Sequence, residues 1–303
     1  MKKIFFCIAL STFLTHPDWA QEAGSKLIIN NDTGLTLAIN ADSGSAANFL
    51  LEPEKEINDD HPGERREYKT KLGNSAENQV RLIMASSEVK IIGHNSDEVI
   101  IETNNYQAPP ARAQGLKPLY NGAEDNTGIG LSVKREGNTL TIVKAQKNQG
   151  KYVIRVPKKV SVAYTEANWN GGDFELSDVE GEIELKLNNS RAELTNVAGP
   201  IVANSTNGGI QVKFKNVNQQ KPSSISVVNG EIDISLPAAT KANWNLRSIN
   251  GEVYTDFDMA LPKDKTDLQK IAGSNNVKGK TNGGGVEMNV YTINSDIFIR
   301  KSK

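Results

Sequence analysis

The sequence predicts an all-β protein that forms a right-handed parallel β-helix, or β-solenoid, with about two short strands per coil. Three observations lead to this prediction. From about residue 79 the chain consists of short runs of alternating polarity, each bounded by Gly, Asn, Asp or Pro. A five-residue unit recurs at a constant spacing in the second half of the chain. No amphipathic helical pattern of useful length interrupts these runs.

Six alternating runs precede the repeated unit, and each is predicted to be a strand. Apolar and polar residues take turns along them, which is the period of a strand that is buried on one face. The predicted strands are 80–84, 89–92, 99–102, 131–133, 140–143 and 152–156.

The repeated unit consists of a small residue, any residue, an apolar residue, a polar residue and an apolar residue. Five consecutive copies begin nine residues apart, at positions 172, 181, 190, 199 and 208. Six further copies follow with longer turns, at positions 223, 230, 242, 251, 284 and 295. Each unit is a short strand entered through a corner that accepts only a small residue. Since one such strand cannot bury its apolar face alone, we expect the units to stack into a column.

The two apolar positions of each unit are predicted to point into the core of this column. A β-sandwich also has short strands, but its strands rarely keep a small residue in the same phase over four nine-residue steps, so the solenoid is favoured. The predicted inward residues are Phe174, Leu176, Ile183, Leu185, Ile201, Ile210, Val212, Ile225, Val227, Ile232, Ile234, Ile249, Val253, Val286, Met288, Ile297 and Ile299.

Residues 1–20 are predicted to be a signal peptide. Lys2 and Lys3 form a basic start, Ile4–Leu14 is apolar, and Ala20 offers a small residue at the cleavage site. The apolar run is much shorter than the roughly 20 residues that a spanning helix needs, so no transmembrane segment is expected in the mature chain. The protein is therefore expected to be exported to the periplasm, the cell surface or the medium.

Cys7 is the only cysteine and lies inside the predicted signal peptide. A lipoprotein site would place small residues just before a cysteine that follows the apolar run, which is not the pattern here. The mature chain is then expected to contain no thiol, which excludes disulfides, cysteine-ligated zinc and a cysteine nucleophile.

The mature chain is predicted to have two parts, a polar arm or linker at 21–78 and the solenoid at 79–303. The arm contains one predicted hairpin, in which Leu27–Ile29 and Leu35–Ile39 flank the turn-forming sequence Asn-Asp-Thr-Gly. The whole sequence has 35 basic and 36 acidic residues. Such a balance offers no basic field that would hold nucleic acid or an anionic bilayer.

The segment 152–162 (YVIRVPKKVSV), the Gly-x-Ile repeats, and Asn-Gly corners at Asn207, Asn229, Asn250 and Asn282 together suggest a family. The chain resembles, over about 79–303, the bacterial family of domains of unknown function described as putative adhesins. The resemblance implies a β-helical fold and a cell-envelope or secreted location. It carries no catalytic motif or functional residue that maps onto these positions.

The two histidines of the mature chain, His61 and His94, lack metal-ligand spacing, and both are predicted to lie in polar turns. Gly171-Gly172-Asp173 is similar to the start of the calcium-binding nonapeptide of β-rolls, but later repeats lack the matching aspartate. The sequence therefore predicts neither a metal nor a cofactor.

The Asn-Gly corners at Asn207, Asn229 and Asn250 recur 21 or 22 residues apart. If one coil takes that length, the corners should stack, with each amide bonded to the next rung.

Trp169 and Tyr164 precede the repeats, and Tyr106, Pro109, Pro110, Pro118 and Tyr120 lie in an insertion at 104–130. These aromatic side chains are expected to shield an end or flank of the solenoid; stacking on sugar rings is the alternative.

A binding or adhesion surface without catalytic activity is the function that this pattern favours, with an unknown envelope, glycan or protein ligand. One alternative is a polysaccharide lyase or glycosidase, because parallel β-helices also carry such enzymes. Another is a purely structural envelope scaffold. The carboxylates available to an enzyme at outward positions are Glu175, Glu182, Glu184, Glu193, Asp233 and Glu252. Alternation places a polar residue at such positions in any solvated strand, so no catalytic residue is assigned.

Overall fold

The computed structural model describes residues 64–119, 122–260 and 276–302, and the backbone of two strands at 26–30 and 36–40. The chain divides into two compact units, Met1–His61 and Pro62–Lys303. Within the described residues every regular element is a strand except η2, a 3-10 turn at Ala111–Ala113. None of these residues belongs to a helix long and apolar enough to span a membrane.

The first unit contains an antiparallel hairpin of β1 (Lys26–Asn30) and β2 (Thr36–Asn40). This confirms the hairpin predicted around the Asn-Asp-Thr-Gly sequence. The predicted signal peptide at 1–20, with Cys7, lies outside the described residues, as do His61 and Tyr120.

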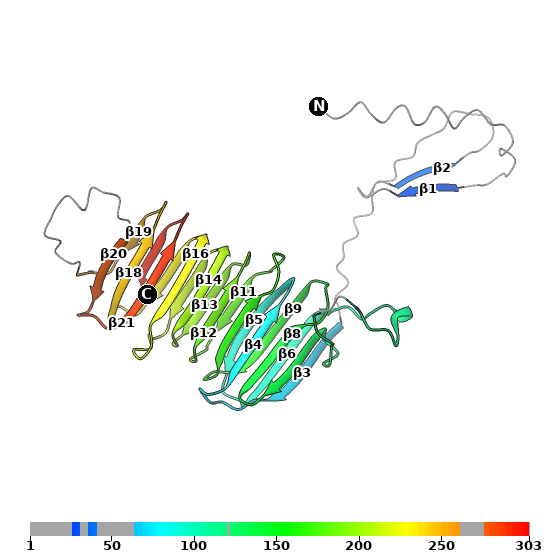
Figure 1. Ribbon diagram of the computed structural model, residues 1–303, viewed down its shortest axis with the longest axis horizontal. Coiled ribbons are helices and arrows are strands. Elements are labelled where there is room, and N and C mark those ends of the chain that lie inside the picture. The colour runs from blue at the N-terminus through cyan, green and yellow to red at the C-terminus, as the bar shows by residue number, and fades with distance from the viewer. Residues whose placement is uncertain (1–25, 31–35, 41–63, 120–121, 261–275, 303) are drawn as a thin grey trace, which may run out of the picture. The chain divides into compact units, whose positions relative to one another are not determined.

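The second unit consists of two ten-stranded sheets (Figure 1). The order in the first sheet is β20 (Asn276–Thr281), β18 (Ala242–Ser248), β21 (Val286–Thr292), β16 (Ser223–Asn229), β14 (Ile201–Asn207), β12 (Ile183–Leu187), β10 (Ser161–Glu166), β4 (Gln79–Met84), β8 (Thr139–Lys144) and β7 (Leu131–Glu136). The order in the second sheet is β19 (Val253–Thr255), β22 (Ile297–Lys301), β17 (Ile232–Leu236), β15 (Ile210–Phe214), β13 (Ala192–Val197), β11 (Phe174–Ser177), β5 (Ser87–His94), β9 (Gly150–Pro157), β6 (Glu98–Tyr106) and β3 (Glu64–Lys71).

From β10 to β17 consecutive strands alternate between the two sheets. Each pairs in parallel with the strand two places away in the chain, so that Ile183 of β12 lies beside Ile201 of β14, and Ala192 of β13 beside Ile210 of β15. This is the connectivity of a solenoid-like fold, because the chain returns to the same sheet after each full turn. The antiparallel pairing of a β-sandwich is not what these strands show.

The six strands predicted ahead of the repeat are confirmed as β4, β5, β6, β7, β8 and β9. Their pairing is less regular than that of the repeats, because β6 runs antiparallel to β9, and β7 antiparallel to β8. β3 lies within the segment predicted to be a polar arm and pairs antiparallel to β6, so it forms the edge of the second sheet.

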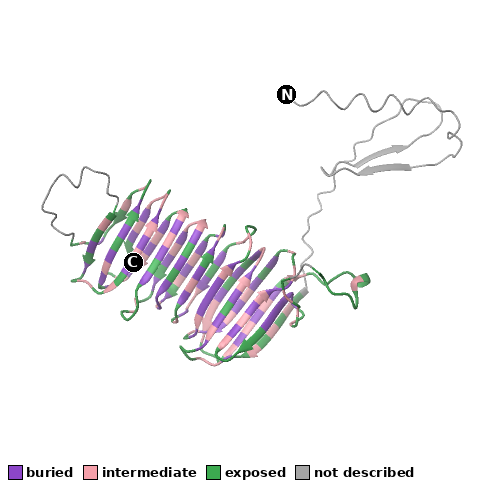
Figure 2. Ribbon diagram, viewed as in Figure 1, coloured by how far each residue is buried: buried purple, intermediate pink, exposed green. Residues whose placement is uncertain are grey.

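The core lies between the two sheets, and buried residues alternate with more exposed ones along the strands (Figure 2). The predicted inward residues are buried, apart from three. Val253 and Val286 are only partly buried and pack against the core. The prediction for Ile249 was wrong, since its side chain is 39% exposed. Ser248, which is fully buried, takes the inward position at the end of β18, and alternation therefore turns the next residue outward.

The small residues at the corners are required by close contact between successive coils. A Cβ atom on Gly199 would lie 1.8 Å from the carbonyl oxygen of Gly181, and one on Gly181 would lie 2.1 Å from that of Val160. Gly230 has a φ of +151°, a conformation that L-residues rarely adopt, and its Cβ would also meet the backbone of Gly208. Small residues therefore recur every nine residues because the backbones of successive coils contact each other at these corners.

Candidate binding surface

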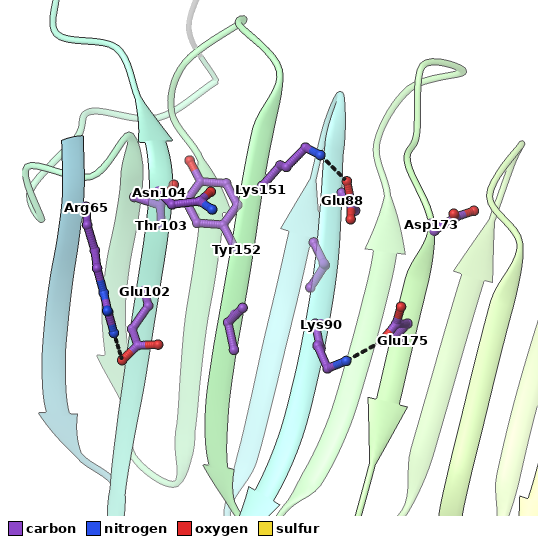
Figure 3. Close-up of a pocket in the computed structure, with 12 residues that line it drawn as sticks. Arg65, Glu88, Lys90, Glu102, Thr103, Asn104, Lys151, Tyr152, Asp173 and Glu175 are labelled. Carbon is purple, nitrogen blue, oxygen red and sulfur yellow. Dashed lines mark hydrogen bonds and ion pairs between the residues drawn. The ribbon is translucent and has the colours of Figure 1, made fainter. Parts of the chain in front are cut away.

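A hollow of about 540 Å³ lies on the outer face of the second sheet, across β3, β6, β9, β5 and β11 (Figure 3). We call it the charged groove, because most of the side chains that line it are ionisable. The charged residues of the groove are Arg65, Glu88, Lys90, Glu102, Lys151, Asp173 and Glu175. They occupy outward positions, so the buried residues between them anchor the groove to the core.

Glu102 lies between two arginines at the β3 side of the groove. Its carboxylate is 2.8 Å from Arg155 on β9 and 3.6 Å from Arg65 on β3. The hydrogen bond from Arg155 holds the pKa of Glu102 below its ordinary value, with help from both positive charges and against the effect of burial. Glu102 is therefore ionised at neutral pH and fixed in place from two sides.

Two further ion pairs cross neighbouring strands of the groove. Lys151 of β9 lies 3.1 Å from Glu88 of β5, and Lys90 of β5 lies 2.6 Å from Glu175 of β11. All four side chains are at least half exposed to solvent. Such pairs add little to stability, because water screens them, so a charged ligand can replace one partner at small cost.

Tyr152 lines the groove but is almost completely buried beneath it. Its hydroxyl donates to the carbonyl of Ile129 at 3.1 Å and accepts a hydrogen bond from the Lys144 ammonium at 2.8 Å. Burial lowers the pKa of Lys144 to about 8, although the Asp125 carboxylate acts to raise it. Burial also raises the pKa of Tyr152 above its ordinary value. This polar pair supports the floor of the groove.

The outward carboxylates singled out in the sequence do not gather at one place. Glu193 and Asp233 continue along the outer face of the second sheet and pair with Lys213 and Arg300, each at 3.1 Å. Glu184 of β12 pairs with Lys186 at 2.7 Å, and Glu182 pairs with Lys221. Glu252 is exposed just ahead of β19. Only Glu175 lies in the charged groove.

His94 was predicted to lie in a turn, but it is the last residue of β5, and the connection to β6 begins after it. Its Nε2 is 2.8 Å from the carbonyl oxygen of Glu98, across the connection from β5 to β6. Asp173 of the calcium-like sequence is exposed at the margin of the charged groove. In the described part of the chain, no group of three or more His, Cys, Asp or Glu side chains is arranged to hold a metal ion.

The predicted stack of Asn-Gly corners forms a hydrogen-bonded amide ladder that is longer than expected. Asn207 donates to Asn189 at 3.1 Å, and Asn229 donates to Asn207 at 2.8 Å. Asn294 then donates to Asn229 at 2.6 Å, and Asn250 to Asn294 at 2.8 Å. The prediction that each amide bonds to the next rung is confirmed, but Asn294 lies between Asn229 and Asn250, because β21 enters the first sheet between β16 and β18.

The aromatic residues named from the sequence have different environments. Tyr164 belongs to the core, where its ring centroid is 4.4 Å from that of Phe174. Tyr106 lies beneath the guanidinium of Arg66, at 4.3 Å from the ring centroid. Trp169 is 59% exposed and remains available to a ligand. Tyr164 is therefore excluded as a platform for sugar rings.

Sequence reasoning missed the charged groove, although part of its signal is visible. Glu88 and Lys90 flank the apolar Val89 of a predicted strand. Lys151 and Glu102 likewise stand next to apolar residues of predicted strands. What the sequence does not reveal is that β9, β5 and β11 are neighbours, because residues far apart in the chain form these pairs.

Residues 157–300 match the family model described as Toastrack DUF4097. This segment is a toastrack domain. The match confirms the resemblance proposed from the Asn-Gly corners and Gly-x-Ile repeats. It begins at the end of β9, so most of the strands that form the charged groove precede the matched segment. The family is one of unknown function, and its description names no catalytic activity.

One solved structure that is similar to this chain is a putative cell adhesion protein from Clostridium sporogenes. It is 11% identical and aligns over 78% of this chain and 100% of its own, with a TM-score of 0.41. A putative adhesin from Bacteroides fragilis is 10% identical over 78% of this chain and 97% of its own, with a TM-score of 0.34. These values are too low to support an argument about function. A comparison with curated proteins found no match.

Proposed function

We propose that this protein is an exported, non-catalytic binding or adhesion module, and that the charged groove is its ligand-binding surface. The observation that carries the proposal is the set of cross-strand ion pairs in the groove. Lys151–Glu88 and Lys90–Glu175 present both signs of charge on a rigid sheet, and all four side chains remain accessible. A charged glycan or an envelope protein is the kind of ligand that fits such a surface.

The carboxylates favour binding over catalysis. A glycosidase needs two carboxyl groups at a set separation, one of them kept protonated by its surroundings. Here Glu175, Glu193 and Asp233 each have a basic partner in an open position on the sheet. Carboxylates that are paired with cations on an open face are suited to holding a ligand in place.

The proposed winding is right-handed. Connections between parallel strands of one sheet are right-handed in nearly all proteins, because the strand twist favours that path.

Export is proposed from the basic and apolar pattern of residues 1–20. Mass spectrometry of the protein recovered from cells tests export: a mature chain that begins near Gln21 supports it, and an intact Met1 contradicts it.

Binding to arrays of glycans and envelope proteins tests the function itself. We expect saturable retention without turnover, and we expect Lys90→Gln with Lys151→Gln to weaken it by about tenfold or more, because two charge-assisted contacts are lost. Lys134→Gln, on β7 of the first sheet, is the matched control and should leave retention unchanged.

The alternative functions give different outcomes in the same experiment. New reducing ends or unsaturated products that disappear in Glu182→Gln with Glu184→Gln would establish the polysaccharide-active enzyme instead. If neither retention nor turnover is observed, the result would favour a structural scaffold.

A further inference from the structure

A loop at residues 107–119 extends from the end of the unit that β3 and β7 border (Figure 1). It is the first part of the connection from β6 to β7 and contains η2. Leu116 is 71% exposed and Leu119 is 90% exposed, the largest values among the exposed large apolar side chains of the described residues. Neither the core nor the charged groove accounts for these two leucines.

The same loop borders a mainly apolar hollow of about 800 Å³. Leu116 is among the residues that line it, together with the prolines Pro109, Pro110 and Pro118. Proline restricts the backbone, so less conformational entropy is lost when such a loop contacts a partner. Exposed leucines around an apolar hollow are typical of a contact site.

The charges of this loop have one sign. Arg112 and Lys117 are the only charged residues between Glu102 and Glu124. Lys117 contacts Glu124 at 3.3 Å, but both side chains are 77% exposed, so this ion pair is weak and readily exchanged. The loop therefore combines exposed apolar side chains with two nearby cations.

We propose that this loop attaches the protein reversibly to the surface of an anionic phospholipid bilayer. Leu116 and Leu119 enter the boundary between headgroups and acyl chains, and Arg112 and Lys117 lie against lipid phosphates. The balanced charge of the whole chain gives no long-range attraction, so the two leucines supply most of the affinity.

A bilayer fits this loop better than a protein partner does. Stable protein interfaces bury about 800 Å² on each partner, which is more than a short protruding loop offers. A bilayer needs only a few inserted apolar side chains with cations beside them. This attachment does not depend on the charged groove, which lies on the outer face of the second sheet.

Sedimentation with lipid vesicles tests the proposal, with protein purified after export. We expect binding to vesicles of equal parts phosphatidylcholine and phosphatidylglycerol, and weaker binding to pure phosphatidylcholine. Leu116→Ser with Leu119→Ser should reduce partitioning about a hundredfold, roughly tenfold for each leucine. Arg112→Gln with Lys117→Gln should remove the preference for phosphatidylglycerol.

The matched control is Val202→Ser with Trp169→Ser, which removes two exposed apolar side chains elsewhere and should leave partitioning unchanged. Leu119→Ser alone, at the more exposed position, should still lower partitioning about tenfold if the double variant proves unstable. The proposal is overturned if the purified protein sediments with neither kind of vesicle, or if the leucine variants bind as the unmodified protein does.

Discussion

At the residue scale, the side chains of one strand divide strictly between the core and the solvent. On β17, Ile232 is fully buried, whereas Asp233 lies on the outer face and accepts a hydrogen bond from Arg300. The two residues are adjacent in the chain and belong to the same strand, so any difference in their sensitivity to substitution comes from the face on which each lies.

We therefore expect Ile232→Ala to lower the free energy of unfolding by about 2–5 kcal/mol, through lost burial and a residual cavity. Asp233→Asn should cost less than about 1 kcal/mol, because the ion pair that it weakens is accessible to water. Denaturant unfolding of both variants is the measurement. If Ile232→Ala has little effect on the unfolding free energy and Asp233→Asn has a large one, then Asp233 faces the core and Ile232 faces the solvent.

The corner glycines provide a second test at this scale. Gly199→Ala would bring a Cβ atom to 1.8 Å from a backbone oxygen of the preceding coil, and that oxygen cannot move without shifting the coil. We expect a loss of roughly 1–3 kcal/mol or more in unfolding free energy, the range for overpacking. Gly122→Ala is the control, since nothing lies within 4 Å of its added Cβ, and should change stability by less than about 0.5 kcal/mol. Equal effects at both positions would contradict the proposed coil contact.

At the scale of the elements, β8 and β9 bring a buried cation into contact with a buried phenol. Lys144 has a pKa of about 8 in the folded protein and an ordinary value of 10.5 when unfolded. Between these values the unfolded chain binds a proton that the folded protein does not, so stability rises with pH over this range. Above pH 10 the trend reverses, because burial raises the pKa of Tyr152 and Tyr164 and only the unfolded state loses those protons.

The predicted result is an unfolding free energy that increases between about pH 8 and pH 10, by at most about 3 kcal/mol, and then falls. Lys144→Met should abolish the increase and leave the fall above pH 10. Urea unfolding at several pH values measures both effects. An increase of the same size in Lys144→Met would show that another group is responsible.

The regular elements were more predictable than the irregular ones. The nine-residue spacing of small residues follows from contacts such as that between Gly199 and Gly181, so this spacing predicts where the strands of the repeat begin. No comparable sequence pattern predicts the antiparallel edge formed by β3, because its pairing with β6 depends on distant residues. For the same reason the pairing of Lys90 with Glu175 was not foreseen. The amide ladder was predictable in kind, but the insertion of β21 changed its order.

At the scale of the whole second unit, one full turn in the most regular part takes 18 residues, as the pairing of Ile183 with Ile201 and of Ala192 with Ile210 shows. Deletion of residues 183–200 should therefore leave a folded protein, because Ile201 would take the place of Ile183, and Asn207 that of Asn189 in the amide ladder. Deletion of 183–191 alone is the control, since it would move every later strand to the other sheet.

We expect the longer deletion to unfold cooperatively and to keep a β-type circular dichroism spectrum, and the shorter one to be far less stable in denaturant. The comparison is informative because the less stable variant is the one that has lost fewer residues. A longer deletion that fails to fold while the shorter one folds would contradict a coil made of two strands.

The stacking of coils also fixes a length. Neighbouring strands lie about 4.8 Å apart, so ten strands hold the edge formed by β3 and β7 roughly 43 Å from the edge formed by β19 and β20. Each added coil would increase this reach by about 4.8 Å without altering either end. The number of coils then sets the distance between a bilayer bound at the loop 107–119 and any partner bound at the opposite end. A change in the number of coils would change this distance in equal steps.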